Sequence, residues 1–234
     1  MLGVISGTIL LQEFAYSRGA KEIVRVNQFG QAHLLVSDTM ALIARHGLKQ
    51  GNQILPHLIN HRANLKALQD VGVSEVIGVN STGSLRQDLP PGIIIIPDDF
   101  IMLSPYSCAC DRQPRHIIPS LNMSVRKHCL AAASRAAVEV VDGCTYWQTP
   151  GPRLETRAEI RMMSQFAHLV GMTMASEAIA AQEMGINYAA ICSVDNYAHG
   201  IGEKELTMEE ISSHALLSSE KVGRIINNYK NMPS

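Results

Sequence analysis

The sequence has no excess of charge of either sign. Its 234 residues include 20 Lys and Arg against 21 Asp and Glu, which gives a formal net charge of -1. A chain this close to neutral has no general electrostatic attraction for nucleic acid or for an anionic membrane surface. We therefore expect neither nucleic acid nor a membrane as its partner.

Long apolar runs and paired cysteines are missing as well. No run approaches the roughly 18 apolar residues that a membrane helix needs, and the apolar stretch at residues 2–5 is too short for a signal peptide. The five cysteines are an odd number, none belongs to a Cys-x-x-Cys pair, and the Cys108-Ala109-Cys110 spacing does not suit zinc. We expect reduced, mostly buried thiols in a cytoplasmic protein, and no metal.

The common nucleotide-binding glycine motifs are also absent. No Gly-x-Gly-x-x-Gly opens a helix, which disfavours a nicotinamide-dependent oxidoreductase. The loop Ser81-Thr82-Gly83-Ser84 is rich in small residues but lacks the lysine of a P-loop, so a nucleoside triphosphatase is disfavoured too.

Short apolar runs alternate with helical patterns along the whole chain, and no linker or repeat interrupts them. The length suits one domain over residues 1–234. Continuous apolar strands separated by helices indicate a sheet that is covered on both faces. We therefore predict an α/β fold, a single-domain three-layer sandwich with a mixed central β-sheet covered by helices. The expected strands are residues 2–5, 23–26, 33–36, 40–44, 76–79, 93–96, 138–141, 145–148, 169–172 and 188–194, and the expected helices are 59–71, 123–137, 155–166, 176–184 and 207–228.

Five polar clusters each follow an expected strand, and the carboxyl ends of strands are where such sheets bind ligands. One cluster alone is usually a turn, but five indicate a composite site. Hydroxyls, a guanidinium able to make a bidentate contact and backbone N–H groups form the donor set that phosphate needs. The candidate phosphate ligands are Thr8, Arg45, His46, Ser81 and Thr173.

The segment Gln148–Thr156 joins a sharp Pro150-Gly151-Pro152 bend to an expected helix. Glu155 and Glu159 would then lie in the first turns of that helix, four residues apart on one face. A fixed carboxylate suits recognition of a ligand N–H, whereas the plain alternative is a strand-to-helix connection with favourable charge at the helix start.

These segments resemble the purine nucleoside phosphorylase and methylthioadenosine phosphorylase family. In that family a Gly-Pro-x-Phe-Glu-Thr-x-Ala-Glu segment borders the base pocket, and residues 151–159 are similar to it. The resemblance continues in order over about residues 1 to 200. It covers Val4–Thr8, Arg45-His46-Gly47, Pro56–Leu68, Gly83–Arg86 and Gly171–Glu177.

The resemblance implies phosphorolysis of a purine nucleoside, with inorganic phosphate as co-substrate and no other cofactor. It gives the five phosphate ligands above their role, places Met172 against the ribose, and puts Leu154 and Ala198 in the base pocket. Glu155 and Asn196 would hold the purine, and together with His46 they are the candidate catalytic residues. His116 would reach the 5′ end of a nucleoside bound in a neighbouring subunit, which implies a homotrimer or homohexamer.

The base preference depends on residues 195–198. Adenine-directed members carry Thr-Asp-Tyr-Asp, where this chain has Asp195-Asn196-Tyr197-Ala198. An amide at Asn196 can donate to O6 and N7, and Glu155 can accept from N1–H. The sequence therefore predicts cleavage of a 6-oxopurine nucleoside, namely inosine, guanosine or 5′-methylthioinosine.

Two alternatives remain open at this point. A one-residue shift would put Asp195 in the pocket and predict a methylthioadenosine phosphorylase. Ser6 and Ile9 replace two glycines of the family's first motif, which favours a non-catalytic nucleoside-binding homologue.

Overall fold

The computed structural model describes residues 1–7, 19–48, 53–109, 116–202 and 208–232, with the backbone alone for 208–212. Its strands are β1 (Leu2–Ser6), β2 (Lys21–Asn27), β3 (Gly30–Val36), β4 (Met40–Ala44), β5 (Glu75–Ser84), β6 (Ile94–Ile96), β7 (Asp99–Met102), β8 (Val140–Asp142), β9 (Thr145–Gln148), β10 (Leu169–Gly171) and β11 (Asn187–Tyr197). Its helices are η2 (Pro56–Leu58, a 3-10 turn), α2 (His61–Asp70), α3 (Met123–Arg135), α4 (Arg157–Met163), α5 (Met174–Glu183) and α6 (Met208–Lys230).

The described strands form one mixed, branched sheet. Its main path runs β2-β3-β4-β1-β5-β10-β9-β7, and β11 branches from β5 to carry β6 and β8. The strands β4, β1, β5 and β11 are mutually parallel where they pair. Their carboxyl ends therefore meet at one edge of the sheet, which is where a ligand site is expected.

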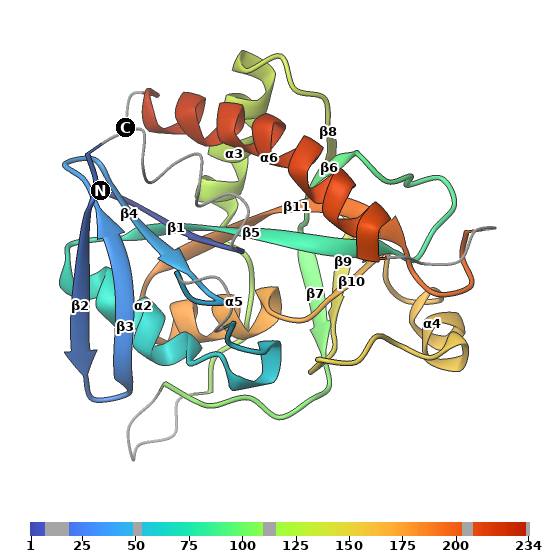
Figure 1. Cartoon of the computed structure of the whole chain (residues 1–234), viewed down its shortest axis with the longest axis horizontal. Coiled ribbons are helices and arrows are strands. Elements are labelled where there is room, and N and C mark those ends of the chain that lie inside the picture. The colour runs from blue at the N-terminus through green and yellow to red at the C-terminus, as the bar shows by residue number, and fades with distance from the viewer. Residues whose placement is uncertain (8–18, 49–52, 110–115, 203–207, 233–234) are drawn as a thin grey trace.

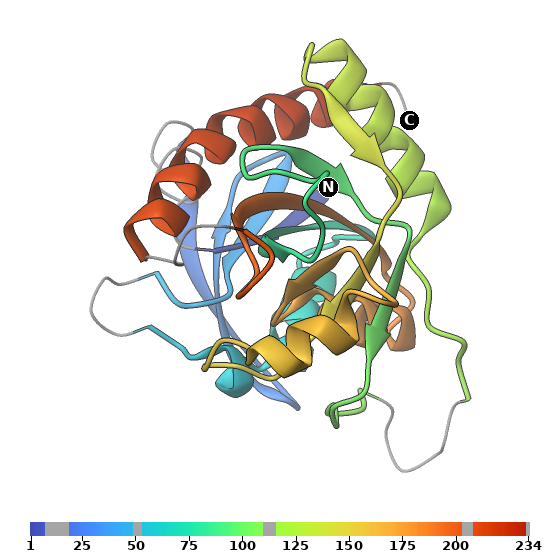
Figure 2. The same ribbon diagram turned by 90° about the vertical axis from the view of Figure 1, so that its right-hand side faces the viewer.

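Helices cover both faces of this sheet, as Figures 1 and 2 show. The helices α3 and α6 pack on one face over a cluster that includes Ile77, Ala189 and Ile225. The helices α2 and α5 pack on the opposite face over a second cluster that includes Leu65 and Tyr188. Burial on both sides explains why β5 and β11 are apolar through most of their length. The predicted three-layer α/β sandwich is confirmed.

Several local expectations were wrong. The polar residues 81–84 and 195–197 do not follow strands, because they are the last residues of β5 and β11. The strand β7 was not expected at all. The helix expected from Glu155 begins only at Arg157, because Thr156 caps it through a hydrogen bond from the Glu159 amide.

The termini of the other long elements lie close to their expected positions. Asn60 caps α2 by accepting from the Ala63 amide, and Asn122 caps α3 by accepting from Ser124 and Val125. Within the described ranges, no helix has the length and apolar character needed to cross a bilayer.

Candidate active site

A cavity of about 460 Å³ opens at the carboxyl ends of β1, β4, β5 and β11, between the loop at residues 152–155 and helix α6. It contains every described candidate of the sequence analysis except His116. The phosphate candidates in its wall are Arg45, His46, Ser81 and Thr173. The nucleoside candidates in its wall are Leu154, Glu155, Met172, Asn196 and Ala198. Thr8 lies outside the described residues, although its neighbour Gly7 lines the same cavity.

Arg45 follows β4 and is almost fully buried, with 3% of its side chain exposed. Its Nε donates to Oε1 of Glu177 at 2.8 Å, and its Nη2 donates to Oε2 at 3.2 Å. The carbonyls of Val79 and Ile5 take two further N–H groups at 2.6 and 3.1 Å. The expectation that Arg45 offers phosphate a bidentate contact was therefore wrong, because its Nε–Nη2 edge is already occupied.

Arg45 and Glu177 form an ion pair that is buried inside the protein. Burial works against the charged form of Arg45, but the Glu177 carboxylate, together with Tyr188 and Tyr146, offsets it, so the pKa of the guanidinium is raised. Burial raises the pKa of Glu177, and Arg45 opposes that rise. Tyr188 also donates to Oε2 of Glu177 at 2.8 Å. The carboxylate thus accepts three hydrogen bonds, as a buried charge requires.

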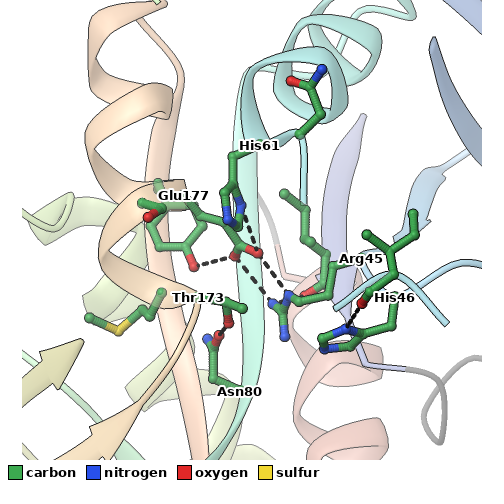
Figure 3. A network of polar contacts seen from close by, with 12 residues as sticks. Arg45, His46, His61, Asn80, Thr173 and Glu177 are labelled. Carbon is green, nitrogen blue, oxygen red and sulfur yellow. Dashed lines mark hydrogen bonds and ion pairs between the residues drawn. The ribbon is translucent and has the colours of Figure 1, made fainter. Parts of the chain in front are cut away.

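His46 lies at the cavity wall with its Nδ1 2.8 Å from the carbonyl oxygen of Ile54. A carbonyl only accepts, so Nδ1 carries the hydrogen and the Nε2 of the neutral ring is an acceptor. Burial, followed by the charge of Arg45, lowers the pKa of His46, while the Ile54 carbonyl opposes this. Figure 3 shows the ring beside the Arg45 guanidinium.

Thr173 is the residue before helix α5, and its Oγ1 donates to Oδ1 of Asn80 at 3.0 Å. The amino end of α5 therefore lies at the cavity, where its partial positive charge favours an anion. Ser81 is exposed within the otherwise buried strand β5, because it opens onto the cavity. Ser81 and the amino end of α5 thus lie in the same cavity wall as the buried Arg45, while the Thr173 hydroxyl hydrogen is taken by Asn80.

The base side of the cavity is built by the turn at Pro150–Pro152. Glu155 is buried, and the Thr149 hydroxyl donates to its Oε1 at 2.6 Å. It lies before α4 and not in its first turn, so it does not share a helix face with Glu159 as expected. Gly151 has a φ of +62°, and a Cβ there would lie 2.5 Å from the Met172 sulfur. The glycine therefore allows Met172 to pack beneath the turn.

Strand β11 brings both Asp195 and Asn196 into the cavity wall. Its pairing with β5 shifts by one residue between Val194 and Asn196, so Asp195 is an extra residue and Asn196 lies opposite Gly83. The Asn196 Nδ2 donates to the carbonyl oxygen of Tyr197 at 2.9 Å, which leaves its second N–H for a ligand.

Asp195 is fully buried and accepts from the Ser193 hydroxyl at 3.0 Å. Burial raises the pKa of Asp195, and the Ser81 and Ser193 hydroxyls oppose the rise. Its other oxygen has no hydrogen-bond partner among the described residues. This carboxyl lies in the cavity wall, as the alternative of a methylthioadenosine phosphorylase requires.

His116 is exposed and is not part of the cavity wall of its own chain. Sequence reasoning missed the residues behind the wall, namely Asn80, Tyr188 and His61. The sequence pattern identified only their neighbour Glu177, as the last residue of the Gly171–Glu177 segment. That match does not show which residues Glu177 contacts.

Comparison with known proteins gives consistent matches. The model of the family described as "Phosphorylase superfamily" matches residues 8–230. An Archaeoglobus fulgidus protein named "Probable 6-oxopurine nucleoside phosphorylase" is 36% identical over 231 residues, which cover 97% of this chain and 94% of that protein. The "6-oxopurine nucleoside phosphorylase" of Pyrococcus furiosus is 34% identical over 202 residues, covering 81% and 76%.

A third relative, the "Probable S-methyl-5'-thioinosine phosphorylase" of Methanocaldococcus jannaschii, is 30% identical over 99% of this chain and 92% of its own length. Among solved structures, a methylthioadenosine phosphorylase from an Antarctic soil metagenomic library superposes with a TM-score of 0.84 at 25% identity, covering 97% of this chain and 84% of that one.

Proposed function

The chain belongs to the phosphorylase superfamily, and from that premise we propose that it is a purine nucleoside phosphorylase acting on 6-oxopurine nucleosides. It cleaves the N-glycosidic bond of inosine, guanosine or 5′-methylthioinosine with inorganic phosphate. The products are the free base and ribose 1-phosphate or its methylthio derivative. Relatives of 30–36% identity carry names for these same activities.

One observation carries the proposal. A single cavity holds an anion-binding end, formed by Arg45, His46 and the start of α5, and a base-binding end, formed by Glu155 and Asn196. A cavity with an anion-binding end beside a base-binding end is the arrangement that phosphorolysis of a nucleoside requires. No group of three His, Cys, Asp or Glu residues in the described part of the chain is placed to hold a metal ion.

The reaction follows from electrostatics. A phosphate oxygen forms a bond to the anomeric carbon as the C–N bond breaks, and the electron pair of that bond leaves with the purine. The ribosyl group becomes cationic between two anionic partners, so fixed donors at both ends stabilise the transition state. The loss of one such donor typically costs about 3 kcal/mol.

His46 accounts for the phosphate proton. Because Nδ1–H is bound to Ile54, the free Nε2 accepts the O–H of hydrogen phosphate and leaves an unprotonated oxygen to attack. As the new bond forms, His46 takes that proton and afterwards releases it to solvent, while the departing purine gains one proton from solvent. Protons and charge therefore balance over the reaction.

The base is read by complementary groups. Glu155 has one oxygen bound to Thr149, and its other oxygen accepts from the N1–H of a 6-oxopurine. Asn196 donates its free N–H to O6 or N7. Leu154 and Ala198 supply apolar contact beside them.

We also propose that the active form is a homotrimer or homohexamer in the cytoplasm. Support comes from the exposed His116 and from the exposed apolar side chains of Leu103 and Ile118. Cys129, Cys144 and Cys192 form no disulfide, which agrees with a reducing compartment.

Methylthioadenosine cleavage is the second candidate, because Asp195 also lies in the cavity wall. The test is incubation with inosine, guanosine, methylthioinosine, adenosine and methylthioadenosine, with and without phosphate, and chromatography of the free base. We expect release from the three 6-oxopurine substrates only, and only with phosphate. Faster release of free base from methylthioadenosine than from methylthioinosine would show that Asp195, and not Asn196, determines the base preference.

A further inference from the structure

The guanidinium of Arg45 has one N–H left for a ligand. An arginine side chain carries five N–H groups. In Arg45, two go to Glu177, one to Ile5 and one to Val79. The remaining hydrogen is on Nη1, and Arg45 lines the cavity. Any rotation of the guanidinium would therefore change the direction in which its one free N–H points.

Glu177 is the group that fixes this orientation. It lies one turn into α5, is fully buried, and is not part of the cavity wall. Both of its oxygens bind Arg45, and Figure 3 shows the carboxylate facing the guanidinium. It reaches phosphate only through Arg45.

The carboxylate is itself held from behind. Tyr188 on β11 donates to Oε2 at 2.8 Å. Gly78 on β5 makes room for this contact, because a Cβ there would lie 1.8 Å from the Tyr188 oxygen and 2.9 Å from Oε2 of Glu177. Residues of three strands and one helix thus converge on the pair, from the end of β4 and from β5, α5 and β11.

His61 also lies beside Glu177, but it does not compete with Arg45 for the charge of the carboxylate. Its Nδ1 is 3.8 Å from Oε1 of Glu177 and has no hydrogen-bond partner within the described residues. Burial, then the charges of Arg45 and His46, lower the pKa of His61 to about 3, so it is neutral near pH 7. Arg45 alone therefore balances the carboxylate.

We propose that Glu177 is a positioning residue for phosphate, which acts by fixing the guanidinium of Arg45 so that its one free N–H faces the cavity. The inference rests on the proposed phosphorolysis. Through Arg45, Glu177 then affects the binding of phosphate and has no role in the binding of the nucleoside.

The test is steady-state kinetics of Glu177→Gln with phosphate and inosine varied separately. Glutamine keeps the size, but one of the two acceptor oxygens becomes an NH2 group, which faces an N–H donor of Arg45. We expect the KM for phosphate to rise at least about tenfold, since a charge-assisted two-point contact is lost, while the KM for inosine stays within about twofold.

The matched control is Glu183→Gln, on the same helix. Glu183 is also buried and accepts from Tyr106, Cys108 and Ala109, but it lies away from the cavity wall. Its variant tests what the loss of a buried carboxylate does to α5 in general. We expect a lower melting temperature and an unchanged KM for phosphate.

Two further variants make the test independent of folding. Tyr188→Phe removes one hydrogen bond to Glu177 and should raise the phosphate KM about two- to fivefold in a folded protein. In an Arg45→Lys background, Glu177→Gln should add little further loss, because both changes act through one contact. Full additivity would contradict a role through Arg45.

The outcomes separate the two proposals. Wild type that releases base equally without phosphate would overturn the phosphorolysis, and this inference with it. Wild type that requires phosphate, beside a folded Glu177→Gln or Tyr188→Phe variant with an unchanged phosphate KM, would overturn the positioning role alone.

Discussion

Asn196 lies directly opposite Gly83 in the sheet, because one extra residue in β11 shifts its pairing with β5. A Cβ on Gly83 would lie 3.2 Å from the Asn196 Nδ2 and 3.2 Å from Val170. The close approach of strand and amide sets where the amide can point. The bulge and the glycine together define the base-binding end of the cavity.

Asn196→Asp should shift the enzyme toward 6-aminopurines. The aspartate loses the donor to O6 and can accept from a 6-amino group. We expect the ratio of kcat/KM for inosine over adenosine to fall about a hundredfold, as buried mismatched polar groups produce. The measurement is the rate of base release from each nucleoside at saturating phosphate. An unchanged ratio would show that Asn196 does not determine the base preference.

Gly83→Ala should weaken nucleoside binding without affecting phosphate. The added methyl must displace the Asn196 amide or Val170, each 3.2 Å away. Crowding of this kind typically costs about 1–3 kcal/mol. We expect the KM for inosine to rise about tenfold or more, with the KM for phosphate unchanged. Equal rises in both constants would show a general distortion of β5.

Much of this site was readable from the sequence, and the reasons are local. Arg45, His46 and Thr173 each come just after an apolar strand, so their place at the sheet edge could be predicted. Strands β5 and β11 continue through the polar residues 81–84 and 195–197. The composition of these residues is typical of turns, so the sequence did not predict them as strand. The capping box at Thr156 was present as residue types, but its hydrogen bonds decided that the helix excludes Glu155.

Other features depend on contacts that no local pattern contains. Arg45 and Glu177 are 132 residues apart in sequence, and only the order of the strands brings them together. Tyr188 is only 11 residues from Glu177, but no periodicity of the sequence shows that its hydroxyl donates to that carboxylate from β11. The prediction of a bidentate phosphate contact was wrong because it took the guanidinium to be unpaired.

Thr156→Ala should destabilise the fold by a modest amount. It removes the side chain that accepts from the Glu159 amide at the start of α4. A lost N-cap typically costs about 1 kcal/mol in the free energy of unfolding. Urea denaturation measures this, with Thr156→Ser, which keeps the cap, as the control. Equal losses in both variants would show that the cap is not the cause.

His61 should make stability depend on acidity. Its pKa falls from 6.5 to about 3 on burial, so the unfolded chain binds its proton first as the pH drops. Its neutral form contributes stability above pH 6.5, and that contribution is lost as the pH falls toward 3, by a few kcal/mol in order of magnitude.

The check is the free energy of unfolding of wild type and His61→Gln between pH 7 and pH 4. We expect the wild type to lose stability more steeply, because the variant lacks this titrating group. Parallel curves would show that His61 is not buried in its neutral form.

The central claim is that phosphate is the nucleophile, and phosphorus NMR of a reaction with inosine tests it most directly. We expect the inorganic phosphate signal to be replaced by that of ribose 1-phosphate, mole for mole with the hypoxanthine released. Release of hypoxanthine with free ribose, while the phosphate signal stays unchanged, would contradict the account.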